Sequence, residues 1–126
     1  MATRRLLVTA LGMVLLGLAT ATAVHAWSTR ASFSFTGPVA LPGVTLHAGT
    51  YNFERMGDAV NLVRVTSRDE TTVYLMTFTN LVSRPSGMPM TPQITLGESP
   101  RGVAPPIKAW YPDGARHGYE FIYGAR

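Results

Sequence analysis

Residues 105–123 read PPIKAWYPDGARHGYEFIY, and the rest of the chain is interpreted outward from this stretch. Two runs rich in aromatic and β-branched residues, Ile107–Tyr111 and His117–Tyr123, flank the triplet Pro112-Asp113-Gly114. The proline ring fixes its own φ, and glycine reaches left-handed φ at little cost, so the triplet favours a turn. The stretch therefore predicts a β-hairpin.

One register of this hairpin accounts for several residues together. It predicts four cross-strand pairs: Tyr111 with His117, Trp110 with Gly118, Lys108 with Glu120, and Ile107 with Phe121. Opposite charges directly across an antiparallel pair stabilise it. We therefore interpret Lys108 and Glu120 as a structural ion pair, which gives a partner to an acid that lies in an otherwise apolar strand. The alternative is that Glu120 is a general acid with a raised pKa.

The first 26 residues have the three-part layout of a secretory signal peptide. Arg4 and Arg5 precede an apolar stretch over residues 6–18, and small residues follow up to Ala26. This apolar stretch is shorter than the roughly 20 residues that cross a bilayer as a helix. We expect a helical signal peptide cleaved after Ala26, or after residue 23, and a periplasmic or secreted product that meets the membrane only during export.

The 100 residues that follow Ala26 are enough for one domain, residues 27–126, and too few for two. They hold ten glycines and nine prolines, a density that breaks helices and favours short strands joined by turns. Nine basic and seven acidic residues give this part a net charge of +2, with no run of Lys or Arg. A nucleic-acid partner is not expected. Cysteine is absent from the chain, so packing alone holds the domain together.

Several segments show the period-two alternation, the β-branched content or the flanking turns of strands. The predicted strands cover residues 31–35, 39–41, 44–46, 50–54, 60–66, 72–79, 93–96, 107–111 and 117–123. Residues 72–79 are apolar on both alternations, which suggests a central strand covered on both faces. Residues 80–92 contain three prolines and are expected to be irregular. The pattern predicts an all-β antiparallel sandwich, or a small barrel, of about seven to eight short strands.

Several of these segments also resemble a family of small exported bacterial proteins of uncharacterised function. The similar segments are residues 33–35, residues 41–53 with the sequence LPGVTLHAGTYNF, residues 107–111, and residues 118–123 with the sequence GYEFIY. His47 stands where this family more often has proline, and the spacing around Pro112-Asp113-Gly114 also differs slightly. The resemblance implies export and a single domain, and it carries no catalytic residues over.

Candidate reaction chemistry is sparse. His47 and His117 are the histidines that remain after residue 26, and His117 with Asp113 or Glu120 would be needed for a metal site. On a strand, His117 and Glu120 point to opposite faces because they are three residues apart. No serine lies in a Gly-x-Ser-x-Gly motif, and Glu98 with Glu120 is a carboxylate pair of the kind that any sequence with seven acids offers. We expect no catalytic residues, no metal and no cofactor.

Aromatic residues gather in the predicted hairpin: Trp110, Tyr111, Tyr119, Phe121 and Tyr123. Buried, they form the core; exposed on one sheet face, Trp110, Tyr111, Tyr119 and Tyr123 form a ligand-binding platform for sugar rings or a partner. The core interpretation is favoured for Phe121 and both stay open for the tyrosines. We expect a non-catalytic exported module with a binding or cell-envelope structural role and a glycan or envelope protein as partner. The alternatives are a carbohydrate-binding module that uses these aromatics, and a small hydrolase or metal-binding protein.

Overall fold

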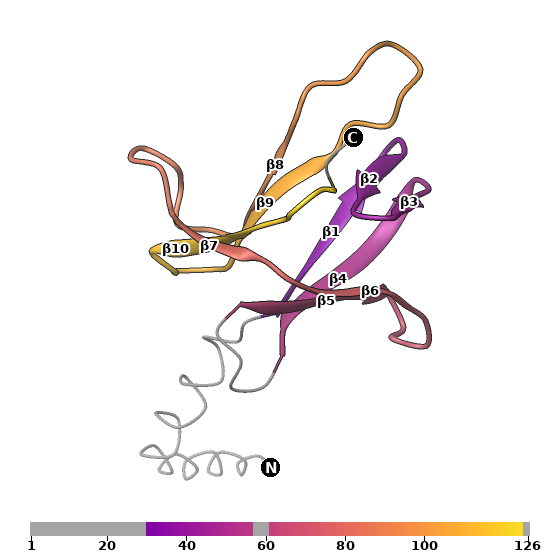
Figure 1. The fold of residues 1–126 in the computed structure, drawn as a ribbon. Coiled ribbons are helices and arrows are strands. Elements are labelled where there is room, and N and C mark those ends of the chain that lie inside the picture. The colour runs from indigo at the N-terminus through magenta and orange to yellow at the C-terminus, as the bar shows by residue number, and fades with distance from the viewer. Residues whose placement is uncertain (1–29, 57–60, 125–126) are drawn as a thin grey trace, which may run out of the picture.

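The computed structural model describes residues 30–56 and 61–124, and the predicted signal peptide lies outside these residues. The described part is all-β and contains ten strands (Figure 1). They are β1 (Arg30–Phe35), β2 (Val39–Leu41), β3 (Val44–Leu46), β4 (Gly49–Arg55), β5 (Leu62–Ser67), β6 (Val73–Phe78), β7 (Asn80–Ser83), β8 (Gln93–Leu96), β9 (Ile107–Tyr111) and β10 (His117–Glu120). Within the described ranges no helix is long and apolar enough to span a membrane.

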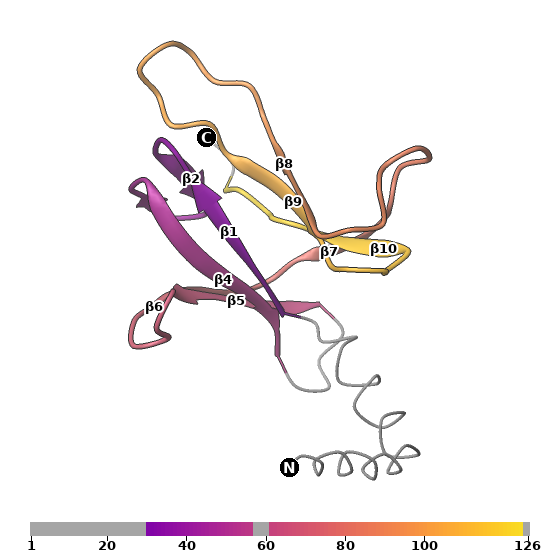
Figure 2. The same cartoon turned by 180° about the vertical axis from the view of Figure 1, so that it is seen from behind.

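The strands form two four-stranded antiparallel sheets and one short hairpin. The first sheet has the order β1-β4-β5-β6, the second has the order β7-β10-β9-β8, and β2 pairs with β3 (Figure 2). The chain passes from the first sheet to the second between β6 and β7, where Thr79 separates the two strands. This arrangement confirms the predicted all-β, antiparallel, sandwich-like fold. The strand without a counterpart among the predicted segments is β7.

The first sheet forms because its strands alternate between a core face and a solvent face. Ala31, Phe53, Val65 and Leu75 lie side by side across β1, β4, β5 and β6 and turn toward the core. The turn at Gly43, whose φ of 76° suits glycine, reverses the chain between β2 and β3. The alternation predicted for residues 31–35 and 50–54 is therefore confirmed.

The core joins both sheets and the β2–β3 hairpin. The Phe53 ring of the first sheet lies 6.0 Å from the Trp110 ring and 6.3 Å from the Phe121 ring, measured between centroids. Val39, Leu41 and Leu46 of the short hairpin and Ile107 of β9 are buried in the same cluster. Packing of aromatic rings from two sheets therefore supplies the stability that a chain without cysteine requires.

The C-terminal hairpin is present, but its register is shifted by one residue from the predicted one. Trp110 pairs with Tyr119 and Ala109 pairs with Glu120. The amide of Ala115 donates to the carbonyl oxygen of Pro112, 3.2 Å away, and the connection between the paired residues is one residue longer than in the predicted register. A shift of one residue exchanges the two faces of a strand. The predicted pairing of Trp110 with Gly118 is therefore wrong.

The same shift removes the expected ion pair between Lys108 and Glu120. Glu120 lies across from Ala109, and the carbonyl oxygen of Lys108 accepts from the Phe121 amide instead. In the described part of the chain the ion pairs join Arg30 to Glu70 and Arg64 to Glu54. The pairing of β9 with β8 is also irregular at Lys108. This irregularity turns both Ile107 and Trp110 toward the core.

Two further predictions are wrong. β6 is the last strand of the first sheet and its side chains at Val73, Met76 and Phe78 are exposed, so it is no central strand covered on both faces. Residues 80–83, expected to be irregular, form β7 and pair with β10 at the edge of the second sheet. The prolines that were taken to prevent pairing begin only at Pro85, after β7 has ended.

Candidate interaction surface

The hairpin aromatics are mainly part of the core. Trp110 has no exposed surface, and Tyr111 and Tyr119 are buried. The rings of Trp110 and Tyr119 lie 5.5 Å apart within the core cluster. Tyr111 lies on the other face of β9, beneath the guanidinium group of Arg84, which is 5.6 Å from the ring centroid. These three rings therefore form no exposed platform.

Tyr123, the fourth residue of the predicted platform, holds the C-terminal segment against β9 and β2. Its hydroxyl group donates to the carbonyl oxygens of Ile107 and Ala40, at 2.6 and 3.1 Å. Burial raises the pKa of this hydroxyl to about 12. The contacts tie the segment after β10 to β9 and β2, which is a structural role.

Replacing Tyr123 with phenylalanine is expected to lower the free energy of unfolding by about 1 kcal/mol at pH 7, the usual net value of a hydrogen bond. In the unfolded chain the hydroxyl ionises near its ordinary pKa of 10.0, and in the folded chain near 12. The contribution is therefore full below pH 10 and is lost as the pH rises toward 12. Urea unfolding of both proteins between pH 7 and pH 11 measures it, and a difference independent of pH contradicts this role.

The residues proposed for a metal or hydrolytic site do not form a cluster. His47 and His117 are both exposed, as are Asp113 and Glu98. No group of three or more His, Cys, Asp or Glu side chains with metal-binding geometry occurs among the described residues. The alternative of a site made from His117 with Asp113 or Glu120 therefore gains no support from the geometry.

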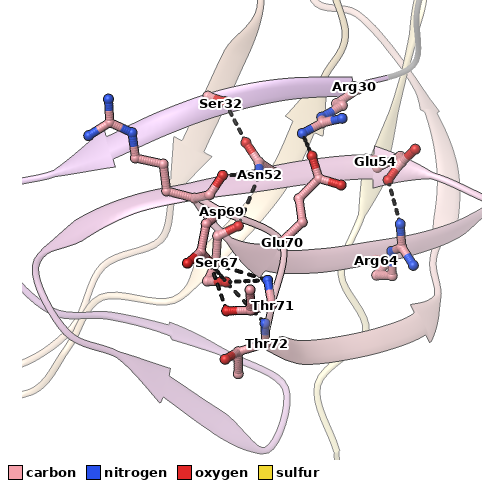
Figure 3. Close-up of polar contacts among 11 residues, drawn as sticks. Arg30, Ser32, Asn52, Glu54, Arg64, Ser67, Asp69, Glu70, Thr71 and Thr72 are labelled. Atoms are coloured by element: carbon pink, nitrogen blue, oxygen red, sulfur yellow. Dashed lines mark hydrogen bonds and ion pairs between the residues drawn. The ribbon is translucent and has the colours of Figure 1, made fainter.

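A polar cluster lies at the turn between β5 and β6 (Figure 3). Asp69 accepts hydrogen bonds from Ser67 and Thr71, and these bonds lower its pKa. Buried Asn52 donates to the carbonyl oxygens of Ser67 and Arg68, and Glu70 forms an ion pair with Arg30 of β1. The turn uses these groups to hold itself against the sheet, so we interpret it as structural.

Two open hollows lie beside the loops. One, of about 470 Å³, is lined by residues 35–39, Leu96 and residues 102–105, among which Thr36 supplies the side-chain hydroxyl. The other, of about 650 Å³, includes Arg84 and Arg116. Arg84 already donates to the carbonyl oxygens of Ala115, Pro112, Pro89 and Thr91, so it serves to hold the β7–β8 loop against the β9–β10 turn.

The most unusual surface is the free side of β6, residues Val73–Phe78, which we call the β6 edge. Phe78 exposes 62% of its surface, Val73 52% and Met76 50%, whereas large apolar residues are normally buried. These side chains share the outer face of the first sheet, since Val73 lies across from Thr66, Met76 from Arg64 and Phe78 from Leu62. Within the first sheet, the exposed large apolar side chains therefore all lie on this strand.

The rest of that outer face is polar. Arg64 is ion-paired with Glu54 of β4, at 2.9 Å, and Ser32 of β1 donates to Asn52 of β4, at 2.5 Å (Figure 3). Apart from Leu62 of β5, which lies across from Phe78, the large apolar side chains of this face therefore belong to the edge strand. A sheet that needed only to face water would carry polar residues there as well.

The backbone of β6 also has free hydrogen-bonding groups. The Thr79 amide donates to the carbonyl oxygen of Asn61, 2.9 Å away, so the backbone of Thr79 points toward the β5 side. Successive residues of an antiparallel strand point these groups to alternate sides. The N–H and C=O groups of Met76 and Phe78 therefore point away from β5, and no described strand pairs with them. The C=O of Phe78 accepts a hydrogen bond from the Thr77 hydroxyl, 3.2 Å away, and keeps a second lone pair for another donor.

Comparison of the chain with protein-family models, with curated proteins and with solved structures found no match. The resemblance to a family of small exported proteins therefore stays a prediction, and the candidate surface is argued from its geometry alone.

Sequence reasoning did not identify the β6 edge as a site. The available signal was that no charged residue and no proline occurs from Val73 to Ser83. Natural edge strands usually carry such residues to prevent pairing with other chains. The same apolar pattern fits a central strand, and it was interpreted in that way.

Proposed function

We propose that residues 27–126 form an exported, non-catalytic binding module of the cell envelope, which holds a protein partner along the β6 edge. The observation that carries the proposal is the uncharged, exposed strand Val73–Phe78, whose outward backbone groups at Met76 and Phe78 no described strand pairs with. A partner strand added there would satisfy those groups and cover the apolar side chains. The signal-peptide pattern of residues 1–26 supports export.

Protein binding fits this surface better than binding of a sugar. Sugar sites combine exposed aromatic ring faces with polar groups. On the outer face the β6 edge offers aliphatic, thioether and phenyl groups beside a row of backbone donors and acceptors, and the Tyr74 ring packs edge-on against Tyr51 of the core cluster. Backbone groups in a row are matched by another extended backbone. The expected partner is therefore a protein segment in strand conformation.

Site-specific photo-crosslinking tests this function. A photoreactive amino acid is placed at Phe78 of the full chain, or at Leu96 as a matched control, because Leu96 is also an exposed apolar residue on an edge strand. We expect an exported product that begins at Trp27 and one discrete cross-linked protein species from position 78 only. Retention inside the cell without cleavage, or equal cross-linking from both positions, contradicts the proposal.

A further inference from the structure

We infer that the partner held by the β6 edge is a second copy of this chain, which pairs antiparallel with the same strand about a two-fold axis. The inference rests on the proposed function, because it names the partner of the same surface. Its first support is charge. Residues 73–83 contain no Lys, Arg, Asp or Glu, so two identical strands meet without placing like charges opposite each other.

Its second support is the pattern of free backbone groups. Directly opposed residues of an antiparallel pair share a face, and those that exchange hydrogen bonds must both point toward the partner. A two-fold axis at Thr77 places Met76 of each copy opposite Phe78 of the other. Both residues point away from β5, so each opposed pair exchanges two backbone hydrogen bonds.

The side chains in this register also match. Met76 and Phe78 lie on the outer face, and a thioether beside a phenyl ring is a favourable contact. The symmetry gives this contact twice, and each copy covers the other's exposed apolar residues. The result is a continuous eight-stranded antiparallel sheet in which β6 is no longer an edge.

β1, at the opposite edge of the same sheet, carries residues that protect it from pairing with another chain. β1 carries Arg30, ion-paired with Glu70, and its hydroxyl side chains at Ser32 and Ser34 bond to Asn52 and Thr50. Charged and polar edge residues of this kind disfavour pairing with another chain. Because β1 has them and β6 lacks them, the first sheet extends in one direction only, which gives a dimer and no filament.

Sedimentation of the exported product, purified from cells that make the full chain, tests the inference. We expect a dimer at micromolar concentration and, for Phe78→Lys, dimerisation weakened at least about 100-fold, since the charge enters the interface twice. Leu96→Lys, at the edge of the second sheet, is the matched control and keeps the dimer. Phe78 is largely exposed, so the variant is expected to keep the circular dichroism spectrum of the native protein.

A cysteine placed on the axis gives an independent measurement. The sequence has no cysteine, so any disulfide in Thr77→Cys joins two chains. Residues opposed at a non-hydrogen-bonded position have Cα atoms about 4.5 Å apart, which suits a disulfide. We expect rapid, nearly complete cross-linking of Thr77→Cys and slow cross-linking of Leu96→Cys.

The outcomes separate this inference from the proposed function. A monomeric product at about 100 µM, well above the dissociation constants of specific complexes, overturns the second copy as partner. If the same monomer cross-links from position 78 to a different protein, the proposed function stands and only the inference fails. If the dimer forms but Phe78→Lys leaves it intact, or both cysteine variants cross-link at equal rates, the β6 edge is not its interface.

Discussion

Replacing Gly118 with alanine is expected to lower the free energy of unfolding by about 3 kcal/mol, the upper range for overpacking. A Cβ atom at this position would lie 2.3 Å from Cδ1 of Tyr111 and 2.8 Å from the carbonyl oxygen of Trp110. The ring of Tyr111 is held beneath Arg84, and the carbonyl group belongs to the backbone of β9, so neither moves without disturbing the hairpin. Glycine is therefore required at this position by close packing.

Urea unfolding monitored by tryptophan fluorescence measures this effect. Gly37→Ala is the matched control, since a Cβ atom there meets nothing within 4 Å, and its stability is expected to change by less than about 0.5 kcal/mol. Tyr111→Ala combined with Gly118→Ala is expected to lose less than the two single losses together, because the ring contact is then absent. A stable Gly118→Ala protein would show that Tyr111 does not lie over this glycine.

Replacing Trp110 with alanine is expected to cost about 3–5 kcal/mol of unfolding free energy, the usual loss for a large buried ring. Trp110 is fully buried and contacts both Phe53 of the first sheet and Tyr119 of β10. The substitution therefore opens a cavity where the two sheets meet. If Trp110 were an exposed binding residue, the substitution would leave stability nearly unchanged. The measurement therefore also decides whether Trp110 belongs to the core or to an exposed binding platform.

A second substitution at this position separates size from hydrogen bonding. The indole Nε1 of Trp110 is buried and has no hydrogen-bond partner among the described residues. Trp110→Phe therefore gives up no hydrogen bond, and its cost is expected to be well below that of the alanine variant. Unfolding is followed by far-ultraviolet circular dichroism, since the fluorescent residue is absent. Equal losses for both variants would mean that Nε1 is hydrogen-bonded in the folded protein.

The local features of this fold could be predicted from the sequence. Alternation at Phe33 and Phe35, and turn chemistry at Pro42-Gly43 and around Gly114, depend on neighbouring residues only, so these strands and hairpins could be located from the sequence, whereas β7 was missed. The hairpin register was not, because it depends on whether Gly118 or Tyr119 lies opposite Trp110, a difference of one residue in the length of the connection. That difference of one residue determines whether Tyr119 or Glu120 faces the core.

The candidate surface depends on a property that is not local. The apolar residues of β6 fit both a central strand and an exposed edge, and only the order of the strands distinguishes the two. That order is set by where β1, β4 and β5 pair and by the passage of the chain through Thr79 to the second sheet. The burial of the hairpin aromatic residues is likewise not a local property, since it depends on Phe53 from the other sheet.

Thr79 also separates the strands that are synthesised first from those that are synthesised later. Every strand of the first sheet precedes it in the sequence, and every strand of the second sheet follows it. All four strands of the first sheet are therefore synthesised before β7, and their hydrogen-bond ladders need no residue that follows Thr79. The Phe53 side chain has no ring contact with the second sheet until Trp110 and Phe121 are synthesised.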